Sequence, residues 1–265
     1  MSNYKKMKSS FPIKTLIWVS LFGIAFGNIE ATVVIYLRHI FYPEGFSFPL
    51  QIINTGIVNS NLTVVECVRE LATMLLLVSI AAVSAKNFNS GFAWFIYAFA
   101  VWDIFYYVFL YLFIDWPQSL LTWDVLFLLP FTWIGPVIAP LINCVCMILL
   151  ALVILQSCQQ KSLIKKWHWA GLIIGSLIVI IAYTQDYVSF MSSDFSIIDL
   201  MNFNNSDKII AKVGSYVPQS FAWWLFGLGV IIHLLVIGHI YFSSRKNIPL
   251  QDILVANEDE VGVKR

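Results

Sequence analysis

The sequence predicts an all-α membrane protein: a bundle of six transmembrane helices, with a short interfacial or re-entrant helix before the fourth. Composition is the first indication, because 59% of the residues are hydrophobic and 12% are charged, against about 45–50% and about 25% in soluble domains. The second is the presence of six continuous apolar segments. Each reaches the roughly 20 residues that a helix rising about 1.5 Å per residue needs to cross a hydrocarbon core about 30 Å thick. Because these segments lack the alternating pattern of barrel strands, we expect helices.

The predicted crossings occupy residues 13–37, 64–85, 91–114, 131–156, 169–187 and 221–242. Two of them contain glycines four residues apart, Gly23 with Gly27 and Gly171 with Gly175, a spacing that favours close packing between membrane helices. The six crossings together predict a single transmembrane domain over residues 1–245, followed by a short cytoplasmic tail over residues 246–265.

The region before the fourth crossing is apolar for longer than one bilayer requires. Pro130, Pro136 and Pro140 interrupt it, and proline removes a backbone donor and clashes with the preceding helical turn. We predict a separate short helix over residues 119–129, lying in the outer interface or entering the membrane as a re-entrant segment. The fourth crossing would then begin near Phe131.

The distribution of Lys and Arg predicts the orientation. Six crossings place both termini on one side, and that side carries twelve of the sixteen basic residues: Lys5, Lys6, Lys8, Lys14, Lys86, Lys161, Lys165, Lys166, Arg245, Lys246, Lys264 and Arg265. The opposite loops hold Arg38, Lys208 and Lys212. Because basic residues favour cytoplasmic loops, we expect both termini in the cytoplasm.

Three acidic residues fall within the outer halves of the first three crossings. Counting residues from the cytoplasmic boundary places Glu30 and Glu70 roughly 6 Å below the outer boundary, and Asp103 roughly 12 Å below it. Apart from Lys14 at the cytoplasmic boundary of the first crossing, Arg69 is the one basic residue within a predicted crossing. Charges at this depth are costly, so they usually face the interior of the bundle and often mark function.

These positions define a predicted ligand or proton site. Asp103, Tyr106 and Tyr107 share one face of a helix, so that the phenols can hydrogen-bond a carboxylate or a ligand. At this depth three acidic residues face one basic residue, Arg69. A carboxylate without a basic partner should bind a cation or hold a proton. The predicted site consists of Glu30, Arg69, Glu70, Asp103, Tyr106 and Tyr107, with an outer rim of Arg38, His39, Glu66 and Asp124.

Structural roles compete with this interpretation. Thr63 and Glu66 fit a capping box, in which the two residues satisfy each other's backbone amides at a helix start. Arg69 would also serve as a purely structural partner of Glu30 or Glu70.

Motifs for other functions are absent. The four cysteines have no C-x-x-C spacing, and no hydrolase, metalloprotease or nucleotide-binding signature occurs. The sequence identifies no catalytic residue, no metal and no cofactor, and no basic tract indicates nucleic acid.

Several stretches resemble a family of uncharacterised bacterial multi-pass membrane proteins. They are EATVVIYLRHIFYPEGFSFPL from residue 30, VECVRELATMLL from residue 65, WDIFYYVFLYLFIDWPQSLLTWDVLFLLP from residue 102 and WIGPVIAP from residue 133. The resemblance covers roughly the first 140 residues. It implies a bacterial inner-membrane setting and carries no activity with it.

Three functions remain open from the sequence. The first is binding or movement of a small polar, cationic or lipid-headgroup ligand at the acidic site, with the bilayer as the other partner. The second is a membrane-embedded enzyme that uses the carboxylates with His39, with or without a metal. The third is a non-catalytic assembly subunit. The sequence does not indicate the oligomeric state.

Overall fold

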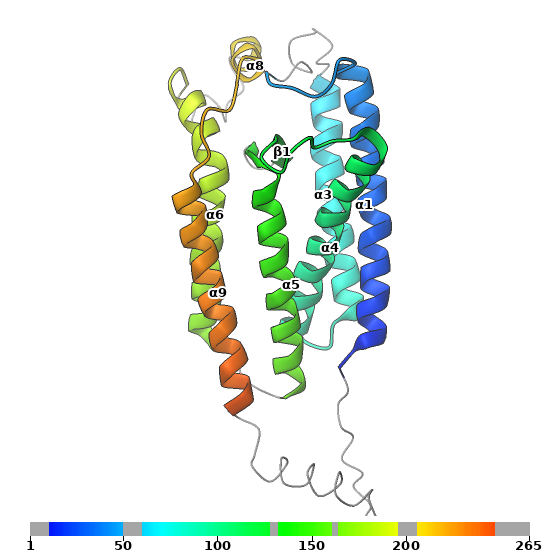
Figure 1. Ribbon diagram of the computed structural model, residues 1–265, viewed down its shortest axis with the longest axis vertical. Coiled ribbons are helices and arrows are strands. Elements are labelled where there is room, and N and C mark those ends of the chain that lie inside the picture. The colour runs from blue at the N-terminus through cyan, green and yellow to red at the C-terminus, as the bar shows by residue number, and fades with distance from the viewer. Residues whose placement is uncertain (1–10, 50–59, 128–131, 161–163, 196–205, 247–265) are drawn as a thin grey trace, which may run out of the picture.

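The protein is a helical membrane bundle, as the sequence predicts. The computed structural model describes residues 11–49, 60–127, 132–160, 164–195 and 206–246 (Figure 1). Within these ranges, six helices are long and apolar enough to cross a membrane. They are α1 (Ile13–Phe41), α3 (Ser60–Ser84), α4 (Phe88–Ile114), α5 (Ile138–Gln159), α6 (Lys166–Ser192) and α9 (Trp223–Lys246). The chain is therefore a multi-pass membrane protein; the predicted tail lies, from residue 247 onward, outside the described residues.

The capping box lies at a different helix start from the one that the sequence predicts. Helix α3 begins at Ser60, so Thr63 lies inside the helix and the predicted capping box with Glu66 is wrong. The box occurs instead at the start of α4, where the Asn87 side chain accepts from the Ser90 amide and the Ser90 hydroxyl accepts from the Asn87 amide, each at 3.0 Å. The signal at Thr63 was misleading because the polar residues before it continue the helix.

A β-hairpin replaces the short helix predicted over residues 119–129. Strands β1 (Trp123–Phe127) and β2 (Trp133–Pro136) pair antiparallel, with Asp124 opposite Gly135. Aromatic and β-branched residues favour this extended pairing. Non-helical backbone is tolerated at the edge of a membrane protein when protein covers it, and Asp124 and Ile134 are 2% and 3% exposed. Helix α5 consequently begins at Ile138, seven residues later than expected.

The helices are arranged as an incomplete ring. Helix α4 packs against α1, α3 and α5, α5 packs against α9, and α9 packs against α6. Figure 1 shows α6 and α9 on one side, α5 in the centre, and α1, α3 and α4 on the other side. Helices α3 and α6 are not among the extensively packed pairs of described elements, so the ring is open between them.

Glycines allow the closest helix contacts, as predicted from their spacing. A Cβ atom at Gly27 would lie 2.8 Å from the Trp102 carbonyl oxygen on α4. A Cβ atom at Gly175 would lie 2.7 Å from the His233 ring on α9. Both glycine pairs therefore mark the lines along which neighbouring backbones meet.

The two ends of the bundle differ in their covering. The first residues of α1 and the last residues of α9 lie at the lower end in Figure 1. The hairpin and the short helix α8 (Ser206–Gly214) lie at the upper end.

Candidate ligand cavity

A cavity of about 700 Å³ lies among the six long helices, below the hairpin. The sequence-predicted residues that line it are Glu30, Arg38, Glu66, Arg69, Glu70, Asp103, Tyr106, Tyr107 and Asp124. His39, the tenth predicted residue, lies on the exposed side of α1 and does not line the cavity. The structure thus brings together side chains from α1, α3, α4 and the hairpin, and their role in binding stays a prediction.

The cavity is amphipathic along its length. Its charged residues lie toward the upper end, near the start of α3 and in the later turns of α4. Farther down, the wall is formed by apolar side chains such as Ile96, Leu150, Leu172 and Ile237. A volume of this size lies in the range of about 300–1,000 Å³ typical of small-molecule sites, which are mostly apolar with a few placed polar groups.

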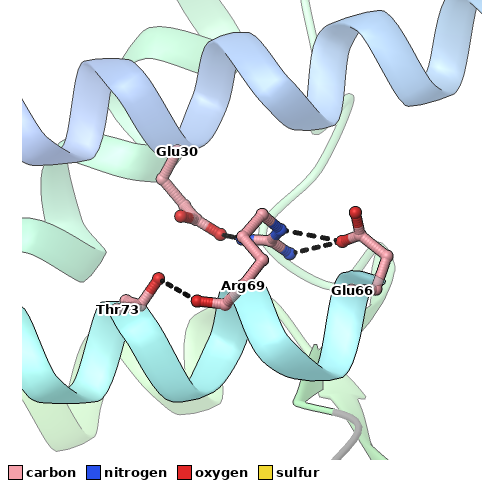
Figure 2. Close-up of polar contacts among 4 residues, drawn as sticks. All are labelled: Glu30, Glu66, Arg69 and Thr73. Atoms are coloured by element: carbon pink, nitrogen blue, oxygen red, sulfur yellow. Dashed lines mark hydrogen bonds and ion pairs between the residues drawn. The ribbon is translucent and has the colours of Figure 1, made fainter. Parts of the chain in front are cut away.

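Arg69 links α3 to α1 at the polar end (Figure 2). Its Nη1 donates to Glu30 Oε1, and its Nε and Nη2 both lie 2.8 Å from Glu66 Oε2. One turn further along α3, the Thr73 hydroxyl donates to the Arg69 carbonyl at 3.0 Å. The predicted structural pairing of Arg69 with Glu30 therefore occurs, and Glu66 joins it instead of capping the helix.

Arg38 and Asp124 form a second ion pair, which closes the upper end beneath the hairpin. Arg38 Nη2 donates to Asp124 Oδ1 at 3.2 Å, and the Tyr107 hydroxyl donates to Asp124 Oδ2 at 3.2 Å. The guanidinium lies 3.7 Å from the centre of the Trp116 ring and 4.5 Å from that of Phe46, a cation–π arrangement.

Burial governs the ionisation of Asp124, which lies outside the spanning helices. Its pKa is raised above the ordinary value because the carboxyl is removed from water. Arg38, Tyr107 and the Val125 amide act in the opposite direction by stabilising the carboxylate. Arg38 and Asp124 are 8% and 2% exposed, so these two predicted rim residues form a buried pair.

Asp103 lies deeper in the cavity with a weaker partner. The Cys144 thiol donates to Asp103 Oδ2 at 3.2 Å, and a thiol is a weak hydrogen-bond donor. Glu70, 9% exposed, lines the same cavity from α3. Among the described residues that line the cavity, five carry carboxylates and two carry guanidiniums, so its polar end favours positive charge.

The opposite wall carries polar residues that the sequence analysis did not include. Asn143 on α5 donates to the Tyr183 hydroxyl at 3.0 Å. On α6 and α9, Ser176 Oγ and His233 Nε2 lie 3.3 Å apart, and His233 Nε2 also lies 3.2 Å from the Leu172 carbonyl oxygen. Isolated polar residues in apolar helices were the available signal, but nothing in the sequence related them to α3 and α4.

The metal-dependent version of the enzyme hypothesis receives no support from the donor geometry. Among the described residues, no group of three or more His, Cys, Asp and Glu side chains is arranged to hold a metal ion. His39, the predicted nitrogen ligand, lies away from the cavity. All four cysteines are free thiols.

Fold and cavity together define the class: a multi-pass membrane protein with an internal amphipathic cavity. Comparisons of the chain with protein-family models, with curated proteins and with solved structures find no match. The carboxylates and the apolar wall of the cavity are therefore the features that indicate a function.

Proposed function

We propose that the cavity binds an amphiphilic cation, a ligand with one positively charged group and an apolar body. The observation that carries this proposal is the combination of surplus carboxylates at one end with an apolar wall along the rest. A charge in a site of low dielectric needs an opposite charge, and an apolar chain gains free energy by leaving water.

Glu70 and Asp103 would hold the charged group. Both line the cavity at its polar end, from α3 and α4. A charge-assisted hydrogen bond contributes about 1.5–3 kcal/mol, and each buried methylene of the ligand about 0.8 kcal/mol. A short alkyl amine should therefore bind detectably.

The proposed setting is the bacterial inner membrane, with both termini in the cytoplasm. The resemblance of the first 140 residues to bacterial multi-pass proteins supports the setting. The excess of Lys and Arg on the side of the termini supports the orientation.

Thermal unfolding of the protein in lipid nanodiscs tests the proposal, with hexylamine as the ligand and hexanol as its uncharged counterpart. Hexylamine should raise the melting temperature more than hexanol. Glu70→Gln should weaken the hexylamine response about tenfold in concentration, because one charge-assisted contact is lost. Glu44→Gln is the matched control, since Glu44 is exposed and does not line the cavity.

Two outcomes would contradict amine binding. One is an equal response to hexylamine and hexanol. The other is a Glu70→Gln protein that responds to hexylamine as the wild type does. A loss of folding yield in Glu70→Gln, with no amine response in either protein, would instead favour an assembly subunit.

A further inference from the structure

We propose that the cavity opens sideways into the hydrocarbon layer between α3 and α6, and that its natural ligand is a membrane lipid with an amine headgroup. This inference rests on the proposed function, because it assigns a source and a class to the amphiphilic cation. Its support is the distribution of buried and exposed residues around the cavity.

The upper end of the cavity is closed by buried side chains. Arg38 and Asp124 meet there in an ion pair, and they are 8% and 2% exposed. Tyr42 and Trp116 beside them are 4% and 8% exposed. Among the described residues, this end therefore offers a ligand no direct route from water.

The lower end is closed by apolar side chains. Ile96, Leu150, Leu172 and Ile237 are 6%, 7%, 5% and 7% exposed. They come from four different helices, α4, α5, α6 and α9, and so close the cavity from several sides.

The opening of the helix ring provides the remaining route. Helices α3 and α6 both line the cavity, yet they are not an extensively packed pair. Two lining residues of the helices that border this gap are exposed, Leu71 on α3, which is 55% exposed, and Ser176 on α6. The other described lining residues are buried or half-buried. Leu71 and Ser176 therefore define a lateral opening of the cavity.

The position of this opening favours a lipid over a water-soluble amine. Leu71 directly follows Glu70, so the opening reaches the polar end. The neighbouring α3 surface is apolar, with Val68 and Leu75 each 59% exposed, as a lipid-facing surface requires. A lipid could place its ammonium group at the carboxylates while its chains extend through the opening into surrounding hydrocarbon.

Photolabelling in nanodiscs of dioleoylphosphatidylglycerol tests the inference. The probe is a two-chain lipid with a primary amine headgroup and a diazirine near the head, and its matched counterpart has a hydroxyl in place of the amine. The amine lipid should label cavity-lining peptides of α4 and α5, and hexylamine should compete with it. The hydroxyl lipid should label them at a background level.

The double variant Leu71→Trp with Ser176→Trp narrows the opening. Labelling by the amine lipid should fall to the hydroxyl-lipid level. Hexylamine has one short chain and passes a narrower opening than a two-chain lipid does, so its melting-temperature shift should remain and show that the cavity is intact. Leu75→Trp with Leu177→Trp is the matched control, because both residues are exposed on the same helices without lining the cavity. If the double tryptophan variant fails to fold, Leu71→Phe alone should lower labelling in the same direction.

The outcomes separate this inference from the proposed function. Three results would overturn lateral lipid entry, even with a normal hexylamine response. They are no labelling of the wild type, equal labelling by the amine and hydroxyl lipids, and labelling of the folded double tryptophan variant that equals that of the wild type. The absence of any hexylamine response in the wild type would overturn the proposed function as well.

Discussion

Arg69 connects two helices whose backbones share little contact. Helix α3 packs extensively on α4, and its link to α1 includes the ion pair between Arg69 and Glu30. The Arg69 side chain is 24% exposed, and that of Glu30 is 12% exposed. Removing one partner of such a pair leaves an uncompensated charge in a poorly solvated place.

We expect Arg69→Gln to lower the free energy of unfolding by about 2–3 kcal/mol, somewhat less than the roughly 3–5 kcal/mol for breaking a fully buried pair, because Arg69 is partly exposed. Unfolding by sodium dodecyl sulfate in mixed micelles provides the measurement. The double variant Arg69→Gln with Glu30→Gln is the control, and it should recover part of the loss because one of the two carboxylates that Arg69 neutralises is also removed. A double variant as unstable as Arg69→Gln would show that the pair is not coupled.

The acidic residues that the sequence places at similar depths in the membrane line the same cavity. Glu30, Glu70 and Asp103 were related by their distance from the membrane surface, which a helix of fixed rise makes predictable. The partners could not be predicted in the same way. Arg69 and Glu66 lie three residues apart on α3, and this local pair was missed because Glu66 was expected to cap the helix. The bond from Cys144 to Asp103 depends on how α5 and α4 rotate and cross.

Among the elements, long apolar runs were predictable and the connection before α5 was not. A run of 20 or more apolar residues in a membrane leaves the helix as its one solution, because every backbone group must bond within the segment. The stretch from Trp123 to Phe127 is too short for that argument to apply. It forms a strand because a partner strand, Trp133–Pro136, is close enough to satisfy its backbone.

The contact between α1 and α4 depends on the absence of a side chain at Gly27. We expect Gly27→Ala to lower the free energy of unfolding by about 1–3 kcal/mol, since the new methyl would meet the α4 backbone, which cannot move aside as a side chain can. The same detergent titration measures it. Gly238→Ala on α9 is the matched control, with no atom within 4 Å of the added Cβ; this change should be neutral or stabilising, because alanine favours helices. Equal destabilisation by both changes would contradict close packing at Gly27.

On the scale of the whole molecule, the path of the chain returns its two ends to one side of the bundle. The first residues of α1 and the last residues of α9 lie at the same end in Figure 1. The geometry alone leaves two orientations in a membrane, and the excess of basic residues at this end favours the cytoplasm for it.

Reporter fusions test the orientation in a bacterial host. A fluorescent protein that matures only in the cytoplasm should be bright when joined to either terminus. Alkaline phosphatase, which is active only outside the cytoplasm, should be inactive at either terminus and active when inserted after Glu44, in the connection between α1 and α3. Active phosphatase at a terminus would reverse the proposed orientation.

Helix α5 joins two groups of helices. It packs against α4 on one side and α9 on the other. Helices α1, α3 and α4 therefore form one group, and α6 and α9 form a second group. Helices α3 and α6 share no extensive packing, but Trp169 on α6 contacts Phe88 and Phe92 on α4, so the two groups are also joined near the start of both helices. We therefore expect the width of the proposed lateral opening to depend on how far α3 and α6 tilt apart beyond that contact, and so on the lateral pressure of the surrounding lipids.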